Sequence, residues 1–252
     1  MQITFLGTGT STGVPVIGCR CAICTSSDAR DRRLRTSMLV EEGRTRVLID
    51  CGPDFREQML PLPFAPLDGV LITHEHYDHV GGLDDLRPFC RWGNIPIFAE
   101  QRVTDALLSR LPYCFVDRPY PGVPSITLHK VEPYLPISVG DATICPLRVY
   151  HGKLPILGYR IGRLGYVTDC SWLPEETMVA LEGIDVLVIN ALRHEPHMAH
   201  QTLEEALAVI ERIGPSSAYL IHINHDMGLH SAVSIELPPH VHLAHDGLVV
   251  RL

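Results

Sequence analysis

The chain has 252 residues, a length that suits one α/β domain able to bury a sizeable core without disulfide bonds. Lysine and arginine total 21 against 29 aspartate and glutamate, and the formal net charge of -8 disfavours general attraction to phosphate backbones or anionic lipid surfaces. The composition, 46% hydrophobic and 20% charged, excludes a disordered chain. No apolar run approaches the ~20 residues of a membrane helix, and no basic segment followed by an apolar one opens the chain. We therefore expect a cytoplasmic protein.

Short apolar or alternating stretches that end at a turn-forming or polar residue predict β-strands along the chain. They cover residues 2–6, 45–50, 69–73, 95–99, 142–150, 165–168, 185–190 and 218–222. Helical spacing is found at residues 101–111, 174–182 and 202–213. Strand-like segments outnumber helices, so two sheets covered by helices fit better than one-for-one βαβ alternation. The Pro-rich passage 112–136 is interpreted as a long surface connection.

Three glycines follow the first expected strand, at Gly7, Gly9 and Gly13. Their spacing is G-x-G-x-x-x-G, whereas a dinucleotide fingerprint requires G-x-G-x-x-G followed by a helix. Pro15 and Gly18 interrupt any helix at this point. The pattern therefore favours a tight turn that borders a site.

Four potential metal ligands lie within six residues directly after the apolar strand at 69–73: His74, His76, Asp78 and His79. Imidazole and carboxylate are ligands that zinc and related divalent ions prefer, and a solvated loop rarely concentrates them in this way. The alternative zinc motif H-E-x-x-H fails at both His-Glu pairs, because Asp78 and Met198 stand where the second histidine should be. The cluster indicates a metal site.

Single donors follow four other expected strands, at Asp50, His151, Asp169 and His222. Each alone would be an ordinary turn aspartate or strand-end histidine. Together with the cluster at 74–79 they supply the nitrogen and oxygen donors that a two-metal site needs.

This combination resembles the metallo-β-lactamase superfamily, in which H-x-H-x-D-H and single histidines and aspartates at strand ends build a binuclear metal site. Within that superfamily the chain is similar to the PhnP phosphodiesterases of phosphonate breakdown. The matching stretches are GTGT at 7–10, GCRCAIC at 18–24, HGKL at 151–154, LPE at 173–175 and HINH at 222–225. The resemblance implies an α/β fold, a four-layer αββα sandwich forming a single domain over residues 1–252, with a zinc loop at 18–25.

The resemblance also implies a role for each donor. His74, His76 and His151 hold the first metal, Asp78, His79 and His222 hold the second, and Asp169 bridges the two. Asp50 falls on the motif whose carboxylate orients ligands by hydrogen bonds. His200 matches a histidine that reaches the substrate, so Asp78, Asp169 and His200 are the expected catalytic residues. A helix-capping or surface role for His200 stays open, and His194 and His197 receive no assignment.

Cys19, Cys21 and Cys24 form a C-x-C-x-x-C pattern, for which a redox cluster and incidental thiols are alternatives to metal binding. The resemblance supplies His225 as a fourth ligand, and Cys₃His is a closed structural zinc set. Without a secretion signal, the remaining five cysteines are expected to be reduced and inert.

The expected function is a phosphodiesterase that uses two divalent ions, zinc or manganese, to activate water for in-line attack on phosphorus. The substrate class implied is small cyclic ribose phosphates. One rival is a tRNA 3′-processing endonuclease of the tRNase Z kind, which needs a basic arm that this acidic chain lacks. Thioester or lactone hydrolysis and a non-catalytic metal-binding scaffold are the others. We expect a small-molecule phosphodiester as partner, no membrane and no nucleic acid, and leave a homodimer open.

Overall fold

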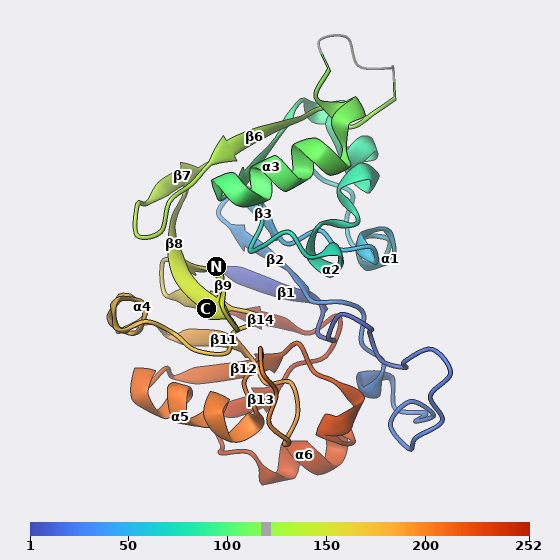
Figure 1. Ribbon diagram of the computed structural model, residues 1–252, viewed down its shortest axis with the longest axis vertical. Coiled ribbons are helices and arrows are strands. Elements are labelled where there is room, and N and C mark those ends of the chain that lie inside the picture. Colours follow the sequence, from blue (N-terminus) through green and yellow to red (C-terminus); the bar gives the residue numbers. More distant parts are fainter. Residues whose placement is uncertain (117–121) are drawn as a thin grey trace.

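Two mixed β-sheets pack face to face at the centre of the protein (Figure 1). The computed structural model describes residues 1–116 and 122–252. Within these ranges the first sheet contains, in spatial order, β14 (Val249–Arg251), β1 (Gln2–Gly7), β2 (Ser37–Glu42), β3 (Thr45–Ile49), β4 (Gly69–Leu71), β5 (Ile95–Ala99) and β6 (Ile126–Lys130). The second contains β13 (Val241–Leu243), β12 (Ser217–Ile221), β11 (Val186–Asn190), β10 (Leu164–Val167), β9 (Leu154–Ile161), β8 (Ala142–His151) and β7 (Ile137–Val139).

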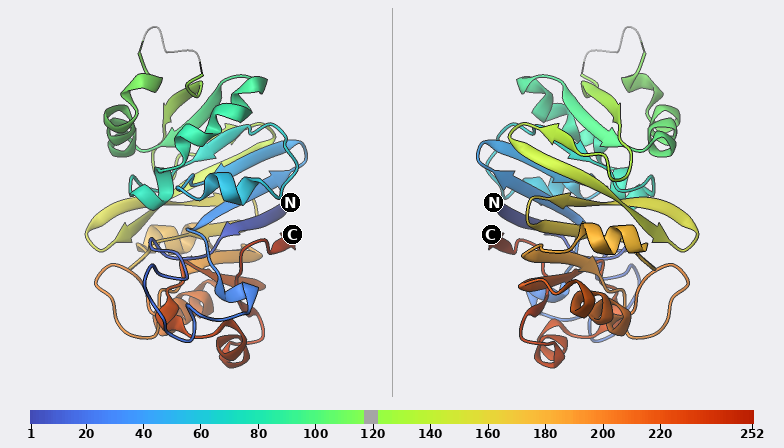
Figure 2. Two further views of the ribbon diagram at one scale, coloured as in Figure 1. Left: turned by 90° about the vertical axis from the view of Figure 1, so that its right-hand side faces the viewer. Right: turned by 90° about the vertical axis from the view of Figure 1, so that its left-hand side faces the viewer.

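Helices cover the outer face of each sheet, which gives four layers (Figure 2). Beside the first sheet lie α1 (Phe55–Met59), α2 (Tyr77–Val80), α3 (Gln101–Arg110) and the 3-10 helices η2 (Leu83–Trp92) and η3 (Pro112–Cys114). Beside the second lie α4 (Glu175–Ala180), α5 (Leu203–Ile213) and α6 (His230–Glu236). The 3-10 helix η1 (Ala29–Asp31) precedes β2, and η4 (His225–Met227) follows β12.

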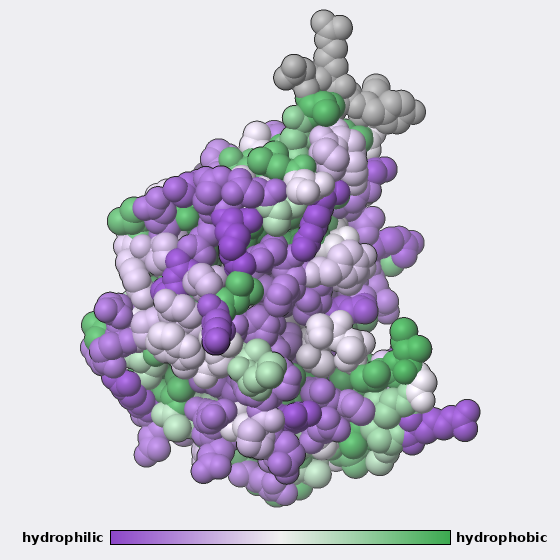
Figure 3. All heavy atoms as spheres, in the orientation of Figure 1, coloured by the Kyte–Doolittle hydropathy of each residue, from purple (hydrophilic) through white to green (hydrophobic). Residues whose placement is uncertain are grey.

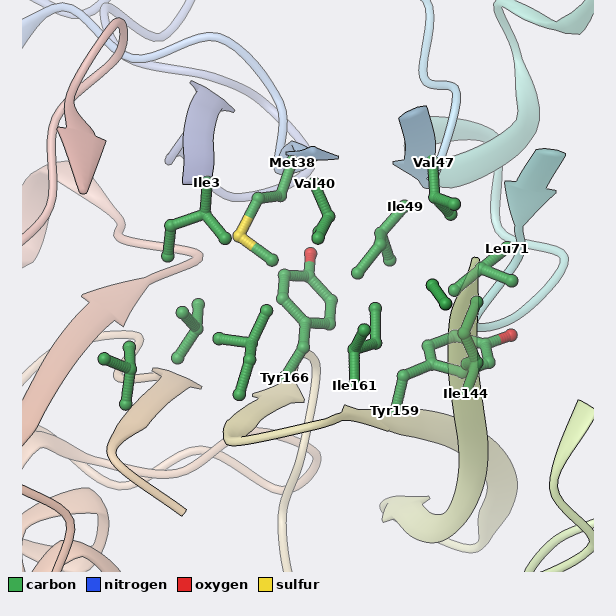
Figure 4. Close-up of a cluster of buried hydrophobic side chains, with 14 of the residues drawn as sticks. Ile3, Met38, Val40, Val47, Ile49, Leu71, Ile144, Tyr159, Ile161 and Tyr166 are labelled. Atoms are coloured by element: carbon green, nitrogen blue, oxygen red, sulfur yellow. The ribbon is translucent and has the colours of Figure 1, made fainter. Parts of the chain in front are cut away.

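Three clusters of buried apolar side chains join these layers. In the central cluster, Tyr166 of β10 points toward Met38, Val40 and Ile49 of the facing sheet (Figure 4). The strands β3 to β6 run parallel, as do β10 to β13. Parallel strands covered on both faces need continuous apolar sequence, which is why segments such as Val186–Asn190 are buried throughout.

The expected four-layer αββα sandwich in a single domain is confirmed. The helix expected at 202–213 is α5, where Thr202 accepts a hydrogen bond from the amide of Glu205 in a capping box. The sequence interpretation missed strands such as β9, whose Pro155 and Gly158 weaken a strand pattern.

The interpretation of 112–136 as a surface connection is wrong in part. The passage contains η3 and the edge strand β6, which pairs in parallel with β5. An edge strand is exposed on one side and has a weak apolar signal, since β6 buries only Ile126 fully. Residues 117–121 of this passage lie outside the described ranges.

The tight turn after β1 depends on glycine. A Cβ atom at Gly7 would lie 2.0 Å from the backbone oxygen of Arg35, and Gly13 has a φ of +64°. Gly9 pairs in an isolated bridge with Ile223, the residue after His222. The turn therefore brings the N-terminal segment beside a strand end that carries a predicted ligand.

In the part of the chain that the structure describes, no helix combines the length and the apolarity needed to cross a bilayer. The face shown in Figure 3 is largely hydrophilic, with an apolar patch over the N-terminal loop at the lower right. Ile17 of that loop is 98% exposed.

A buried arginine connects the N-terminal segment to the C-terminal one. Arg33, 5% exposed, donates hydrogen bonds to Thr8 Oγ1 at 2.8 Å and to the carbonyl of Ala244 at 2.6 Å. Thr8 Oγ1 in turn donates to Asp246 Oδ1 at 2.7 Å, and the amide of Leu34 donates to Asp246 Oδ2 at 2.6 Å. Burial lowers the pKa of Arg33 to about 10 and raises the pKa of Asp246 to about 6.

Replacing Arg33 by Met should lower the free energy of unfolding by about 3 kcal/mol at pH 8, because a buried carboxylate then loses its neighbouring cation. The raised pKa of Asp246 adds stability that is complete below the usual carboxyl value and is lost as the pH rises through about 6. The deficit should therefore be smaller at pH 5, where Asp246 is mostly neutral. Urea unfolding at pH 8 and at pH 5 measures the two free energies of unfolding, and Arg32→Met, at an exposed position, is the control. Equal stabilities for the two variants would contradict the role of this network.

Candidate metal centre

The predicted donors stand just beyond the strands of both sheets. Asp50 follows β3, Asp169 lies two residues after β10, and His222 follows β12 directly. Each adopts a left-handed backbone, with φ of 60°, 53° and 55°, and in the described ranges Tyr134 is the one other non-glycine residue with positive φ. Such conformations are uncommon for non-glycine residues and cluster at functional sites. The strained backbone therefore coincides with the donors.

Three histidines form the first donor cluster. The ligand atoms of His74, His76 and His151 lie within 4.8 Å of one another. His74 is fully buried, and its Nε2 lies 3.0 Å from His76 Nδ1. The His74 Nδ1 atom contacts Thr73 Oγ1 at 3.0 Å, which directs Nε2 into the cluster.

Two histidines and two aspartates form the second cluster. The ligand atoms of Asp78, His79, Asp169 and His222 also lie within 4.8 Å of one another. Asp169 Oδ1 lies 3.3 Å from His79 Nε2 and 3.2 Å from His222 Nε2, while its Oδ2 lies 3.9 Å from His74 Nε2. Asp169 thus turns one oxygen toward each cluster, which is the geometry of a bridging carboxylate.

These donors fit divalent cations. Several buried ring nitrogens have no hydrogen-bond partner in the described ranges: Nε2 of His79, both ring nitrogens of His222, and Nδ1 of His200. A buried polar atom left unpaired costs about 1–3 kcal/mol. Histidine and carboxylate donors of this kind are the ones that zinc, manganese and related ions bind, so a cation in each cluster would satisfy the site.

The electrostatics of the cluster also favour cations. Burial alone would raise the pKa of Asp169, but His222 and His79 outweigh it and hold that pKa well below its usual range. Burial, with the nearby charge of His79, lowers the pKa of His74 well below its usual value. Against its burial, the carboxylates of Asp169, Asp50 and Asp78 raise the pKa of His79. Asp169 and His74 therefore have the protonation states that ligands require, an ionised carboxylate and a neutral imidazole, whereas a cation bound at His79 would displace a proton from its ring.

Asp50 and a backbone carbonyl orient two of the donor histidines. His79 Nδ1 donates to Asp50 Oδ2 at 2.7 Å, and the amide and hydroxyl of Thr73 donate to the same carboxylate. His151 Nδ1 donates to the carbonyl of Ala199 at 2.8 Å. Each bond leaves Nε2 of the histidine as the ligand atom, which is how outer partners tune metal sites. The sequence pattern pointed to Asp50, whereas no sequence signal marks Thr73 or the carbonyl of Ala199.

The second residue of the histidine motif has a different task. Glu75 Oε1 accepts a hydrogen bond from Arg102 Nη1 of α3 at 2.6 Å, and its backbone carbonyl accepts one from Arg110. These contacts attach the motif to α3. The Glu75 carboxylate thus pairs with an arginine of α3 and takes no part in either donor cluster.

His200 lies at the edge of both clusters. Its ring centroid is 4.5 Å from that of His151 and 4.9 Å from that of His222. Burial, and then the charge of His222, lowers the pKa of His200 to about 3. Proton donation by this imidazole therefore requires a bound anion that raises its pKa. The capping alternative is wrong, because Thr202 caps α5.

A separate sulfur-rich cluster lies in the N-terminal loop. His225 Nδ1 is 3.5 Å from Cys19 Sγ, 3.3 Å from Cys21 Sγ and 3.6 Å from Cys24 Sγ. A tetrahedron with zinc–sulfur bonds of about 2.3 Å and a zinc–nitrogen bond of about 2.0 Å places nitrogen about 3.5 Å from each sulfur. The four residues therefore have the spacing of a closed Cys₃His set.

The thiols of this cluster differ in acidity. A hydrogen bond from the amide of Cys24, together with His225, lowers the pKa of Cys21 to about 6. Burial raises the pKa of Cys24 to about 11. At neutral pH one thiol is thus largely ionised before any cation binds, which provides an initial ligand for a metal ion.

Comparison with known proteins agrees with this geometry. Residues 45–223 match the family described as Beta-lactamase superfamily domain. The octanoyltransferase of Porphyromonas gingivalis is 47% identical over 250 residues, which are 98% of this chain and 51% of that protein. The chain thus spans about half the length of this relative.

Two solved structures have the same architecture. A new diphosphatase from the PhnP family superposes with a TM-score of 0.92 at 40% identity, over 99% of this chain and 96% of that one. Zn²⁺-bound PqqB from Methylobacterium extorquens superposes with a TM-score of 0.83 at 21% identity over the full length of both chains, which shows the fold. The chain belongs to the beta-lactamase superfamily and has a metallo-β-lactamase fold close to that of the PhnP family.

Proposed function

We propose that the protein is a metal-dependent hydrolase, a binuclear phosphodiesterase that cleaves small phosphodiesters. The observation that carries the proposal is the placement of Asp169, whose two oxygens face the two donor clusters. We assign His74, His76 and His151 to one ion, Asp78, His79 and His222 to the other, and Asp169 to both. Zinc and manganese both accept such ligands.

A phosphoryl centre suits this site chemically. When bound, a pair of divalent ions supplies an activated water and neutralises the charge on phosphoryl oxygens. The chain itself keeps the ligand nitrogens of His79 and His151 directed inward through Asp50 and the carbonyl of Ala199. His200 is placed to donate an N–H hydrogen bond to the substrate, and a phosphate anion beside it favours its protonated form, which can then protonate the departing oxygen.

One structural neighbour supports phosphorus chemistry. The PhnP-family neighbour, at 40% identity, is a diphosphatase. We therefore propose diphosphate diesters beside cyclic ribose phosphates as substrate classes. The net charge of -8 makes RNA a poor substrate for this chain.

Acyl chemistry is the alternative that a specific observation favours, because one relative is named an octanoyltransferase. About half of that protein lies beyond the part that matches this chain, and that half can carry the acyl transfer. A thioester must nevertheless be included in any substrate panel, since the same metal ligands can serve acyl hydrolysis.

Protein loaded with zinc or manganese should hydrolyse bis(p-nitrophenyl) phosphate and act little on the resulting monoester. Asp169→Ala should abolish this activity, because the second ion loses its link to the first, whereas Asp105→Ala on α3 makes the same charge change at an exposed position and should retain it. Nitrophenol release measures both. Hydrolysis of an octanoyl thioester or a lactone far faster than of any phosphodiester would show that the reaction class is wrong.

His200→Ala should matter more for substrates with poor leaving groups, because general-acid assistance grows with the basicity of the departing oxygen. We expect about a 10²-fold loss of kcat/KM on alkyl esters and a much smaller loss on nitrophenyl esters. Equal losses on the two series would assign His200 to substrate binding instead of proton donation.

We further propose that the cysteine cluster with His225 holds one structural zinc. Cys21→Ser should remove about one zinc per chain, lower Tm, and reduce activity without eliminating it, because His225 lies three residues after the proposed ligand His222. Cys145→Ser, at a thiol outside the cluster, is the matched control. Element counting and thermal melting decide the matter. Unchanged zinc content with unchanged melting would refute the assignment.

A further inference from the structure

One loop lies between the proposed catalytic donors and the element η4, which carries His225 of the cysteine cluster. Residues 193–200 run between β11 and α5 and end at His200. The loop carries the carbonyl of Ala199, which accepts the hydrogen bond from His151 Nδ1 at 2.8 Å. The conformation of this loop therefore sets both the ring orientation of one proposed ligand and the position of the proposed proton donor.

A single guanidinium organises the loop from within. Arg193 Nε donates to the carbonyl of Glu195 at 3.2 Å, and Arg193 Nη2 donates to the carbonyl of Pro196 at 3.1 Å. The third nitrogen, Nη1, lies 3.6 Å from Asp226 Oδ2. Arginine offers several donors in a rigid fork, which lysine does not, so two carbonyl acceptors and one ion pair held by a single side chain form an arginine-specific contact set.

The neighbouring histidine fastens the loop to the same element. His194 Nε2 donates to the carbonyl of Met227 at 3.0 Å. Asp226 and Met227 belong to η4, whose first residue is His225 of the cysteine cluster. The base of the loop is also fixed, because the amide of Leu192 donates to the carbonyl of Gln201 at 2.9 Å.

The ion pair between Arg193 and Asp226 alone contributes too little free energy to fix the conformation of the loop. The Arg193–Asp226 pair is partly exposed, with side-chain exposures of 28% and 50%, and pairs of this kind contribute about 0–1 kcal/mol. The hydrogen bonds to the carbonyls of Glu195 and Pro196 add to this pair, because they restrict the backbone of a loop that has no helix or strand of its own. The contact set therefore selects one loop conformation.

We propose that Arg193 and His194 are positioning residues that hold the 193–200 loop against η4, so that Ala199 and His200 are correctly placed at the catalytic donors. The proposal rests on the proposed function for its activity readout and on the proposed metal ligands for its Mn²⁺ readout, whereas hydrogen exchange is independent of both. The proposal also gives the cysteine cluster two connections to the catalytic donors. One is the short chain segment between His222 and His225, and the other runs through η4 and the loop.

The test uses Arg193→Gln and Arg193→Lys, with Arg212→Gln as the control. Arg212, paired with Glu175 on the outside of the protein, undergoes the same charge change away from the loop. Amide hydrogen exchange should accelerate at Leu192 and Ala199 in both Arg193 variants and stay unchanged in the control. Titration of the catalytic clusters with Mn²⁺ should show about a 10-fold weaker affinity, as expected when an outer partner of a ligating histidine is loosened.

Activity adds a signature that general destabilisation would not produce. The Arg193 variants should lose more kcat on alkyl than on nitrophenyl phosphodiesters, as His200→Ala does, while KM changes less. Arg193→Lys should behave like Arg193→Gln, since one ammonium cannot reach the two carbonyls and the Asp226 carboxylate together. Full restoration by lysine, or exchange and Mn²⁺ affinity equal to those of the control, would overturn the proposal. If the wild type cleaves no phosphodiester, the proposed function fails, while exchange and metal titration still decide the role of the loop.

Discussion

The site depends on the charge of Asp169, a carboxylate that is 2% exposed beyond the end of β10. A charge in such a place is costly unless it is paired and hydrogen-bonded. The Nε2 atoms of His74, His79 and His222 lie within 3.9 Å of its oxygens, and two further carboxylates, those of Asp50 and Asp78, contact His79. Three carboxylates thus face one histidine with a raised pKa, an excess of negative charge that calls for cations. The fold places these groups, and the chemistry of the site follows from that excess.

Two features of the fold bring the donors together. Each sheet has a parallel half, and strands in parallel end at a common edge, so His74, Asp169 and His222 meet there although they are far apart in sequence. The left-handed backbone of Asp50, Asp169 and His222 then turns the chain immediately after each strand. The strain is maintained because the flanking strands are buried on both faces and resist rearrangement.

Much of this arrangement could be predicted from the sequence, for a physical reason. The parallel strands need continuous apolar runs, and a polar donor at the end of such a run stands out, as with Asp50 after Val47-Leu48-Ile49. Edge strands such as β6 give no comparable signal, because one side faces water. Backbone partners such as the carbonyl of Ala199 give none at all, since any residue supplies a carbonyl. The pKa of His200 was likewise outside the reach of the sequence, because it depends on packing against His222 and His151.

Two elements outside the donor clusters support their position. The cysteine cluster and the 193–200 loop surround the catalytic donors without contributing to either cluster, and both are attached through η4.

The central claim is that Asp169 lies between two ions, and anomalous diffraction from crystals grown with Zn²⁺ or Mn²⁺ tests it most directly. The account predicts two peaks on either side of the Asp169 carboxylate. A single peak there, or none, would contradict it.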